Sequence, residues 1–117
     1  MGKLKWFLLL VVSIQVICLH AQTDNESFLK GSVLFNEQCS NCHILGEPSL
    51  GPDLRNSVIS RPKDWFSRFT RSHRQLLLEK DSVATKLYFD HNRLVHTEHD
   101  LTDEQLMDLI HYIESMK

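Results

Sequence analysis

Hydrophobic residues recur along this chain at intervals of three and four positions, the spacing that places side chains on one face of an α-helix. Four segments carry the pattern: 27–38, a stretch beginning at Pro62, 81–89, and a stretch beginning at Thr102. Their apolar positions are Phe28, Leu29, Val33, Leu34 and Phe35; Trp65, Phe66 and Phe69; Val83 and Leu87; and Leu106, Leu109, Ile110 and Ile113. Since no segment alternates with the period of a strand, we expect an all-α fold.

Polar residues indicate where these helices begin. Thr102 and Gln105 are spaced as a capping box, and Asp81 or Ser82 is expected to be the N-cap of the preceding helix. The segments 44–54 and 90–100 lack helical spacing, and the first is rich in glycine and proline. Both are therefore expected to be loops. The polar residues 22–26 are expected to be frayed.

The first 21 residues have the features of a secretory signal peptide. A short basic region precedes an apolar run, and the segment ends on the small residue Ala21. We expect cleavage after Ala21, which leaves residues 22–117 as one exported or periplasmic domain with no stable membrane insertion. An uncleaved anchor and a lipoprotein linked through Cys18 are alternatives. The apolar run is short for a bilayer, and Gln15 and Ile17 are poor neighbours for lipid attachment.

Cleavage also changes the charge of the chain. Loss of Lys3 and Lys5 takes the formal net charge from −2 to −4. Because an acidic surface repels polyanions, nucleic acid and anionic lipid are not expected as partners.

Cys39, Cys42 and His43 form the one motif with a specific chemistry. Two cysteines three positions apart, followed at once by histidine, are typical of covalent attachment of one haem c. The two thiols add to the two vinyl groups of the porphyrin, and the adjacent imidazole becomes the proximal ligand of the iron. The alternatives are a local Cys39–Cys42 disulfide and half of a zinc site, but residues 22–117 contain no second pair of cysteines.

The residues before this motif extend it into a family pattern. Gly31 and Phe35 precede Cys39 at intervals of four, and this segment resembles the first helix and haem-binding segment of the class I cytochromes c. The resemblance covers residues 27–115. It implies that Gly31 and Phe35 cross the last helix near an aromatic residue, here Tyr112. A glycine inside a helix costs about 1 kcal/mol relative to alanine, so close approach of a second helix would explain Gly31; a merely tolerated glycine is the alternative.

The resemblance also implies roles for residues after the motif. Gly51-Pro52-Asp53-Leu54 is similar to a family segment in which the proline carbonyl accepts a hydrogen bond from the proximal histidine and the leucine packs on the haem. An iron-bound histidine needs its second ring nitrogen held, which favours Pro52, although an ordinary turn proline is the alternative. In the family an indole N–H binds a haem propionate near the position of Trp65. Arg55 and Arg61 are further candidates for neutralising propionates, although for each of them singly a solvated surface charge is the favoured alternative.

The sixth ligand departs from the family pattern. Class I cytochromes c usually place methionine in the loop before the last helix, but the register counted back from Leu101 falls on His96. We therefore expect ligation by His43 and His96. The alternatives are His99 or His91, which lie in the same loop, and a five-coordinate iron. Thioether ligation raises the reduction potential, so its replacement by imidazole is expected to lower it.

These features favour a monomeric, monohaem electron carrier that works with redox partner proteins and is not itself an enzyme. A haem-based sensor of gases or other ligands, with an open or displaceable sixth site, is the alternative. A small peroxidase is a third hypothesis, but the sequence offers no distal acid–base constellation for it.

Overall fold

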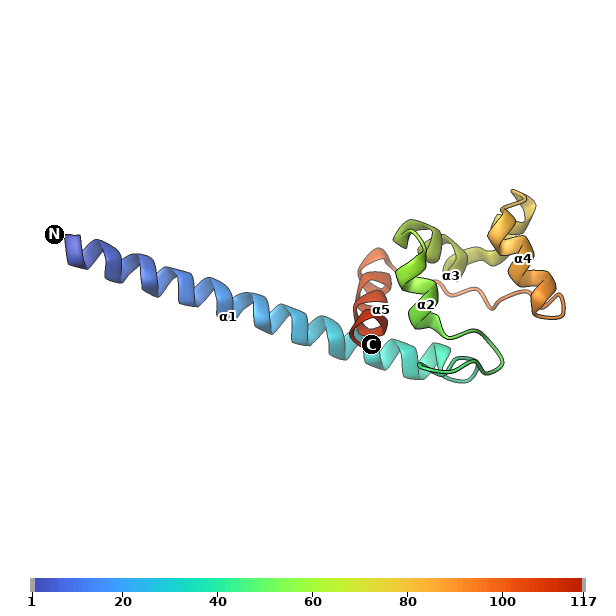
Figure 1. Cartoon of the computed structure of the whole chain (residues 1–117), viewed down its shortest axis with the longest axis horizontal. Helices are drawn as coiled ribbons and strands as arrows, with labels where there is room; N and C mark the ends of the chain where they lie inside the picture. Colours follow the sequence, from blue (N-terminus) through green and yellow to red (C-terminus); the bar gives the residue numbers. More distant parts are fainter. Residues whose placement is uncertain (1, 117) are drawn as a thin grey trace.

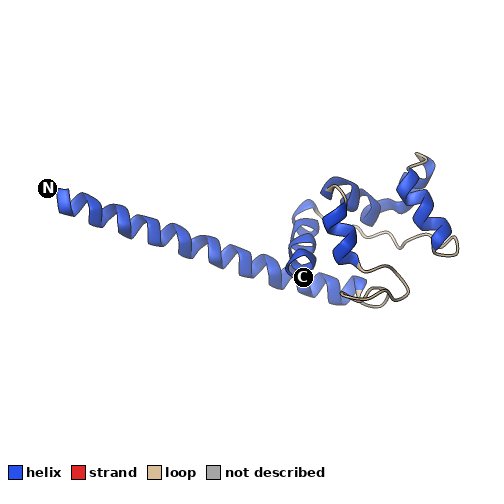
Figure 2. Cartoon of the chain, in the orientation of Figure 1, coloured by secondary structure: helices blue, strands red, loops and turns tan. Residues whose placement is uncertain are grey.

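The computed structural model describes residues 2–116; the side chains of Leu4, Leu10 and residues 12–22 lie outside the description. The described chain is helical apart from loops and one isolated β-bridge between Ile44 and Glu47 (Figure 2). In order, the elements are α1 (Gly2–Leu34), the π-helical turn η1 (Phe35–Cys39), α2 (Leu54–Ser60), α3 (Lys63–Leu78), α4 (Ser82–Asp90) and α5 (Asp103–Ser115). The expected all-α fold is confirmed.

α1 and α5 cross at Gly31, and the close approach explains the glycine. A Cβ on Gly31 would lie 2.0 Å from the backbone oxygen of Asp108 and 2.7 Å from Cβ of Tyr112. The ring of Tyr112 packs against Phe28 and Phe35, with centroids 5.2 and 5.7 Å apart. Only a residue without a side chain fits at this crossing, so the prediction for Gly31, Phe35 and Tyr112 is confirmed.

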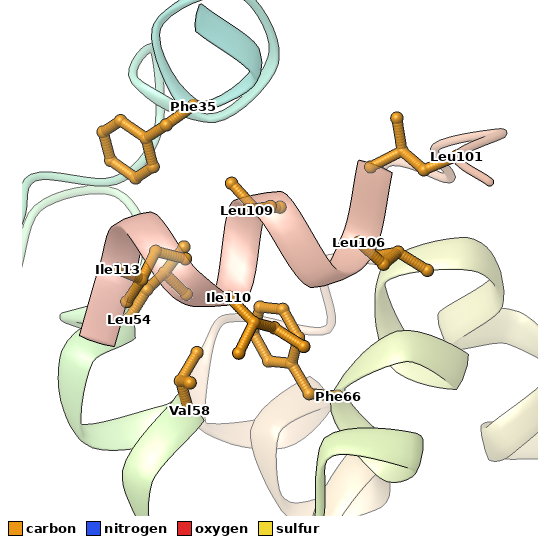
Figure 3. Packing of buried hydrophobic residues seen from close by; sticks show 9 residues of the cluster. All are labelled: Phe35, Leu54, Val58, Phe66, Leu101, Leu106, Leu109, Ile110 and Ile113. Carbon is orange, nitrogen blue, oxygen red and sulfur yellow. The ribbon is translucent and has the colours of Figure 1, made fainter. Parts of the chain in front are cut away.

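The hydrophobic core is built around α5 (Figure 3). Leu106, Leu109, Ile110 and Ile113 are all buried, as their helical spacing predicts. α5 begins with the expected capping box, in which Thr102 and Gln105 each accept a hydrogen bond from the backbone of the other. The rest of the cluster comes from η1, α2, α3 and the loop that leads into α5: Phe35, Leu54, Val58, Phe66 and Leu101.

Four local expectations are corrected by the structure. Residues 22–26 are helical within α1 instead of frayed, and the helix expected to reach residue 38 becomes the π-helical turn at Phe35. α2 was not expected from the sequence; in this helix Leu54 and Val58 are buried one turn apart, and Asp53 is the N-cap. In α4, Asp81 is the N-cap as expected, but the buried residue is Ala84, whereas Val83 and Leu87 are only partly buried.

α3 is interrupted at Ser72, where the backbone is extended (φ −156°, ψ 83°). The interruption lies beside the segment that connects α4 to α5, since the amide of His99 donates to the carbonyl of Thr70 at 3.1 Å. This connecting segment, residues 91–102, is non-helical, as predicted for 90–100.

The N-terminal half of α1 projects away from the other helices (Figure 1). Its described side chains include the exposed Trp6, Phe7, Leu8 and Leu9. Across the described residues, we find no helix with both the length and the apolar character required to cross a membrane. Met1 and the side chains from 12 to 21 lie outside the description, so the signal peptide remains a prediction.

Candidate functional site

The two cysteines lie where the first helix ends. Cys39 is the last residue of η1 and its carbonyl accepts from the amides of Cys42 and His43, at 3.1 and 3.0 Å. This tight turn holds both thiols and the imidazole on one short segment. Both thiols are free. Burial, and after it the neighbouring Cys42, raises the pKa of Cys39 to about 11, so its thiol is protonated at neutral pH.

His43 is 7% exposed, and its ring is held from two sides. Nδ1 lies 2.9 Å from the carbonyl oxygen of Pro52, the partner expected from the sequence. Since a carbonyl only accepts, Nδ1 carries the proton and Nε2 keeps a free lone pair. Gly51 lies against the same ring: a Cβ on it would be 2.3 Å from Cε1 of His43.

His96 lies on the other side of this site. The centroids of the His43 and His96 rings are 6.0 Å apart. Nδ1 of His96 is buried and has no hydrogen-bond partner. Burial, followed by the nearby His43 and His99, lowers the pKa of His96 to about 4, so this imidazole is neutral at pH 7.

These two histidines fit a metal between them. Metal–imidazole bonds are about 2 Å long, so two imidazoles on opposite sides of one metal have ring centroids about 6 Å apart once the ring radii are added. A neutral imidazole with a free ring nitrogen is the form that binds a metal. An unpartnered buried nitrogen is costly in a protein, and ligation would satisfy it. The donor set therefore fits the iron of a haem c attached at Cys39 and Cys42.

The two alternative ligands lie in different settings. Nδ1 of His99 is 3.0 Å from the side-chain oxygen of Gln38, and its ring centroid is 5.7 Å from that of His96. His91 is the C-cap of α4, where its amide donates to the carbonyl of Leu87. The structure thus brings His96 to His43 and engages His99 with a different partner.

Trp65 has a hydrogen-bond partner within the protein. Its indole N–H donates to Oδ2 of Asp81 at 3.2 Å, which joins α3 to the N-cap of α4. The guanidinium of Arg61 lies 4.9 Å from the centre of the Trp65 ring, and its Nε is buried without a partner. Arg55 instead pairs with Asp53 at 3.0 Å. Of these three side chains, Arg61 has a buried N–H donor, Nε, that could bind an anionic group such as a carboxylate.

His73 was missed by the sequence reasoning. It is 2% exposed, and its Nδ1 accepts the backbone N–H of His96 at 3.0 Å. The signal that would have found it is its position four residues after Phe69, on the buried side of α3. Its ring centroid is 4.4 Å from that of Phe69.

Comparison with known proteins identifies the family of this chain. The family model described as cytochrome c matches residues 28–117. A solved cytochrome c from Rhodothermus marinus is similar, with a TM-score of 0.71, 24% identity, and coverage of 80% of this chain and 78% of that chain. A solved cytochrome c domain from Pseudomonas putida has a TM-score of 0.64 and 34% identity, with coverage of 73% of this chain and 85% of that chain.

A search of curated proteins found no match. The family match spans the whole region that carries the cysteines, both facing histidines and the crossing of α1 and α5. The chain therefore belongs to the cytochrome c family, whose members carry covalently bound haem c and transfer electrons.

Proposed function

We propose that this protein is an exported, monohaem electron carrier in which His43 and His96 are the two axial ligands. The observation that carries the proposal is the 6.0 Å separation of two imidazole rings, one with its Nδ1 bound to Pro52 and the other with a buried, unpartnered Nδ1. When bound, haem c supplies a one-electron couple between ferric and ferrous iron.

The chain's own residues bind and orient the group in this proposal. Cys39 and Cys42 form the two thioethers, and the Pro52 carbonyl fixes the orientation and tautomer of His43. Leu54 contributes apolar surface from α2, where it is buried. Arg61, with its unpartnered buried Nε, is the propionate donor. Because its indole N–H is bound to Asp81, Trp65 contributes by packing beneath Arg61.

The cellular setting follows from the N-terminal sequence. We propose that residues 1–21 direct export and are removed, and that residues 22–117 function as a periplasmic monomer. Redox partner proteins would then dock through small, weak interfaces, which is usual for electron-transfer encounters.

The replacement of thioether by imidazole provides the test. A potentiometric titration of the holoprotein should give a reduction potential below that of the His96→Met variant, since thioether ligation raises the potential. Low-temperature electron paramagnetic resonance should report two imidazoles in the wild type and a changed ligand field in the variant. If both measurements were the same for wild type and His96→Met, His96 would not be the ligand.

Carbon monoxide distinguishes the carrier from a ligand sensor. A sensor needs an open sixth site, so its ferrous form would bind carbon monoxide rapidly. We expect slow binding, because His96 is partly buried beside His43 and its amide is held by His73. Rapid binding by the wild type would favour the sensor.

A further inference from the structure

Four consecutive residues of α3 hold the loop that carries His96. At the interruption of the helix, Thr70, Arg71, Ser72 and His73 each contact a different loop residue. Two of the contacts are made to the end of the loop: the Thr70 carbonyl accepts from the amide of His99 at 3.1 Å, and Arg71 Nε donates to the Leu101 carbonyl at 2.9 Å. Ser72 Oγ donates to Oε1 of Glu98 at 3.0 Å. His73 Nδ1 accepts from the amide of His96 at 3.0 Å.

His73 is the member of this set that contacts His96 itself. Its second nitrogen, Nε2, lies 3.3 Å from the carbonyl oxygen of Ala84 in α4. A backbone amide can only donate and a carbonyl can only accept, so the two contacts together require a proton on Nε2 and a lone pair on Nδ1. The neutral Nε2–H tautomer satisfies both contacts, and it connects α4, α3 and the loop through one buried ring.

Packing limits the movement of that ring. His73 is 2% exposed, and its neighbours include Phe69, at 4.4 Å between centroids, and Tyr88, at 6.4 Å. The same Phe69 ring lies 5.2 Å from the ring of His96. Around His96 the loop is open to solvent, since Leu94, Val95 and Thr97 are exposed. The backbone of His96 is thus bound to a buried ring of α3, whereas the side chains next to it in the loop are exposed.

We propose that His73 is a positioning residue that keeps His96 in place as the sixth ligand and slows its dissociation from the iron. The inference rests on the proposed ligation by His96. A fixed backbone amide restricts the directions in which the His96 imidazole can leave, and detachment through movement of the loop requires the hydrogen bond to His73 to break as well. This favours the closed, six-coordinate site that an electron carrier needs.

Three substitutions of His73 separate the hydrogen bond from the packing. Asn places an amide oxygen near the position of Nδ1 and retains the acceptor, whereas Gln places its amide group near Nε2 and loses that acceptor. Leu removes both polar groups. Ser72→Ala is the matched control, because it breaks the neighbouring contact to Glu98 and leaves the His96 amide bound.

The measurement is the rate at which excess cyanide replaces the sixth ligand of the ferric holoprotein, followed by stopped-flow absorbance, with electron paramagnetic resonance of each resting variant. We expect an increase of about tenfold for Gln and Leu, the ratio that corresponds to about 1.4 kcal/mol. For Asn and Ser72→Ala we expect a change below about threefold. If Leu does not yield folded holoprotein, the comparison of Asn with Gln decides, since both are polar amides.

Two outcomes would overturn the inference, and only the first of them would also overturn the proposed ligation by His96. If His96→Ala leaves the spectrum and the replacement rate unchanged, His96 is not the ligand and the proposed ligation fails together with the inference. If His96→Ala opens the site but Gln and Leu at position 73 exchange as slowly as Asn, the proposed ligation stands and His73 has no positioning role.

Discussion

Gly51 sets the position of the proximal imidazole at the scale of a single residue. A Cβ there would lie 2.3 Å from Cε1 and 2.7 Å from Nδ1 of His43. Gly51→Ala should therefore displace the ring, weaken its hydrogen bond to Pro52, and lower stability by about 1–3 kcal/mol, as overpacking usually does. Thermal unfolding and electron paramagnetic resonance of the holoprotein measure both effects. The neighbouring, exposed Leu50→Ala should change neither; equal behaviour of the two variants would contradict the contact.

Asp53 gives the chain a defined response to acid. Its hydrogen bonds to Arg55, foremost among several contacts, lower the pKa of this carboxyl. In the unfolded chain the value is about 3.9, so the unfolded state binds more protons as the pH falls through that value. The stabilisation is therefore complete above about pH 4 and is lost below it.

Asp53→Asn tests this response, because asparagine is an equally good N-cap but does not titrate. The wild type should be more stable than the variant near neutral pH, and the difference should shrink as the pH falls below about 4. Urea unfolding followed by circular dichroism at several pH values measures it. A difference that stays constant down to strongly acidic pH would contradict a contribution from the charge of Asp53.

Single residues were predictable where the chemistry is local in sequence. The contact of His43 with Pro52 could be predicted because the two residues lie nine positions apart. The position of His96 near His43 agrees with its register to Leu101, while its role as a ligand stays a prediction. The role of His73 could not be predicted, because it depends on an interruption at Ser72 that no glycine or proline marks. For Trp65, the sequence shows that the indole N–H needs an acceptor, but not that Asp81, sixteen residues later, would be that acceptor.

At the scale of elements, the crossing of α1 and α5 depends on one glycine. The Gly31→Ala substitution gains about 1 kcal/mol of helix propensity. It also places a Cβ 2.0 Å from a backbone oxygen of Asp108, which cannot rotate away as a side chain would. We expect net destabilisation of about 1–3 kcal/mol, measured by thermal unfolding. Ser32→Ala, one position along the same helix, is the control, and an unchanged or higher melting temperature for Gly31→Ala would contradict the contact.

Elements were predictable in proportion to the regularity of their pattern. α5 combines a capping box with four buried positions at helical spacing, and both were predicted. α2 has only seven residues and follows a loop rich in glycine and proline, so its two buried positions, Leu54 and Val58, gave too short a pattern. The change from α-helix to π-helix at Phe35 covers only five residues, which is too short to alter the spacing of hydrophobic residues in the sequence.

At the scale of the whole molecule, the contacts that tie α1 to α5 include three from its C-terminal part. Ser27 donates to Asp108 at 2.5 Å, Phe28 packs on Tyr112, and Lys30 pairs with Glu104 at 3.4 Å. The principal extents are 71 × 27 × 23 Å, and the long dimension follows α1 (Figure 1). The family match likewise begins at residue 28. Its C-terminal part therefore supplies the crossing with α5 that stabilises the fold.

A chain that begins at Gln22 should consequently fold as well as the full-length chain. The crossing with α5 is intact in this chain, because it retains Ser27, Phe28, Lys30 and Gly31. Matured holoprotein of residues 22–117 should therefore show the same melting temperature and the same electron paramagnetic resonance spectrum as the full-length chain. Removal of six further residues, to begin at Phe28, takes away the Ser27 hydrogen bond to the buried Asp108. That second chain should be less stable by about 1–3 kcal/mol, because a buried carboxylate loses its partner. If the chain from Gln22 were already destabilised, residues 1–21 would belong to the folded domain, and their removal as a signal peptide would be incompatible with a stable carrier.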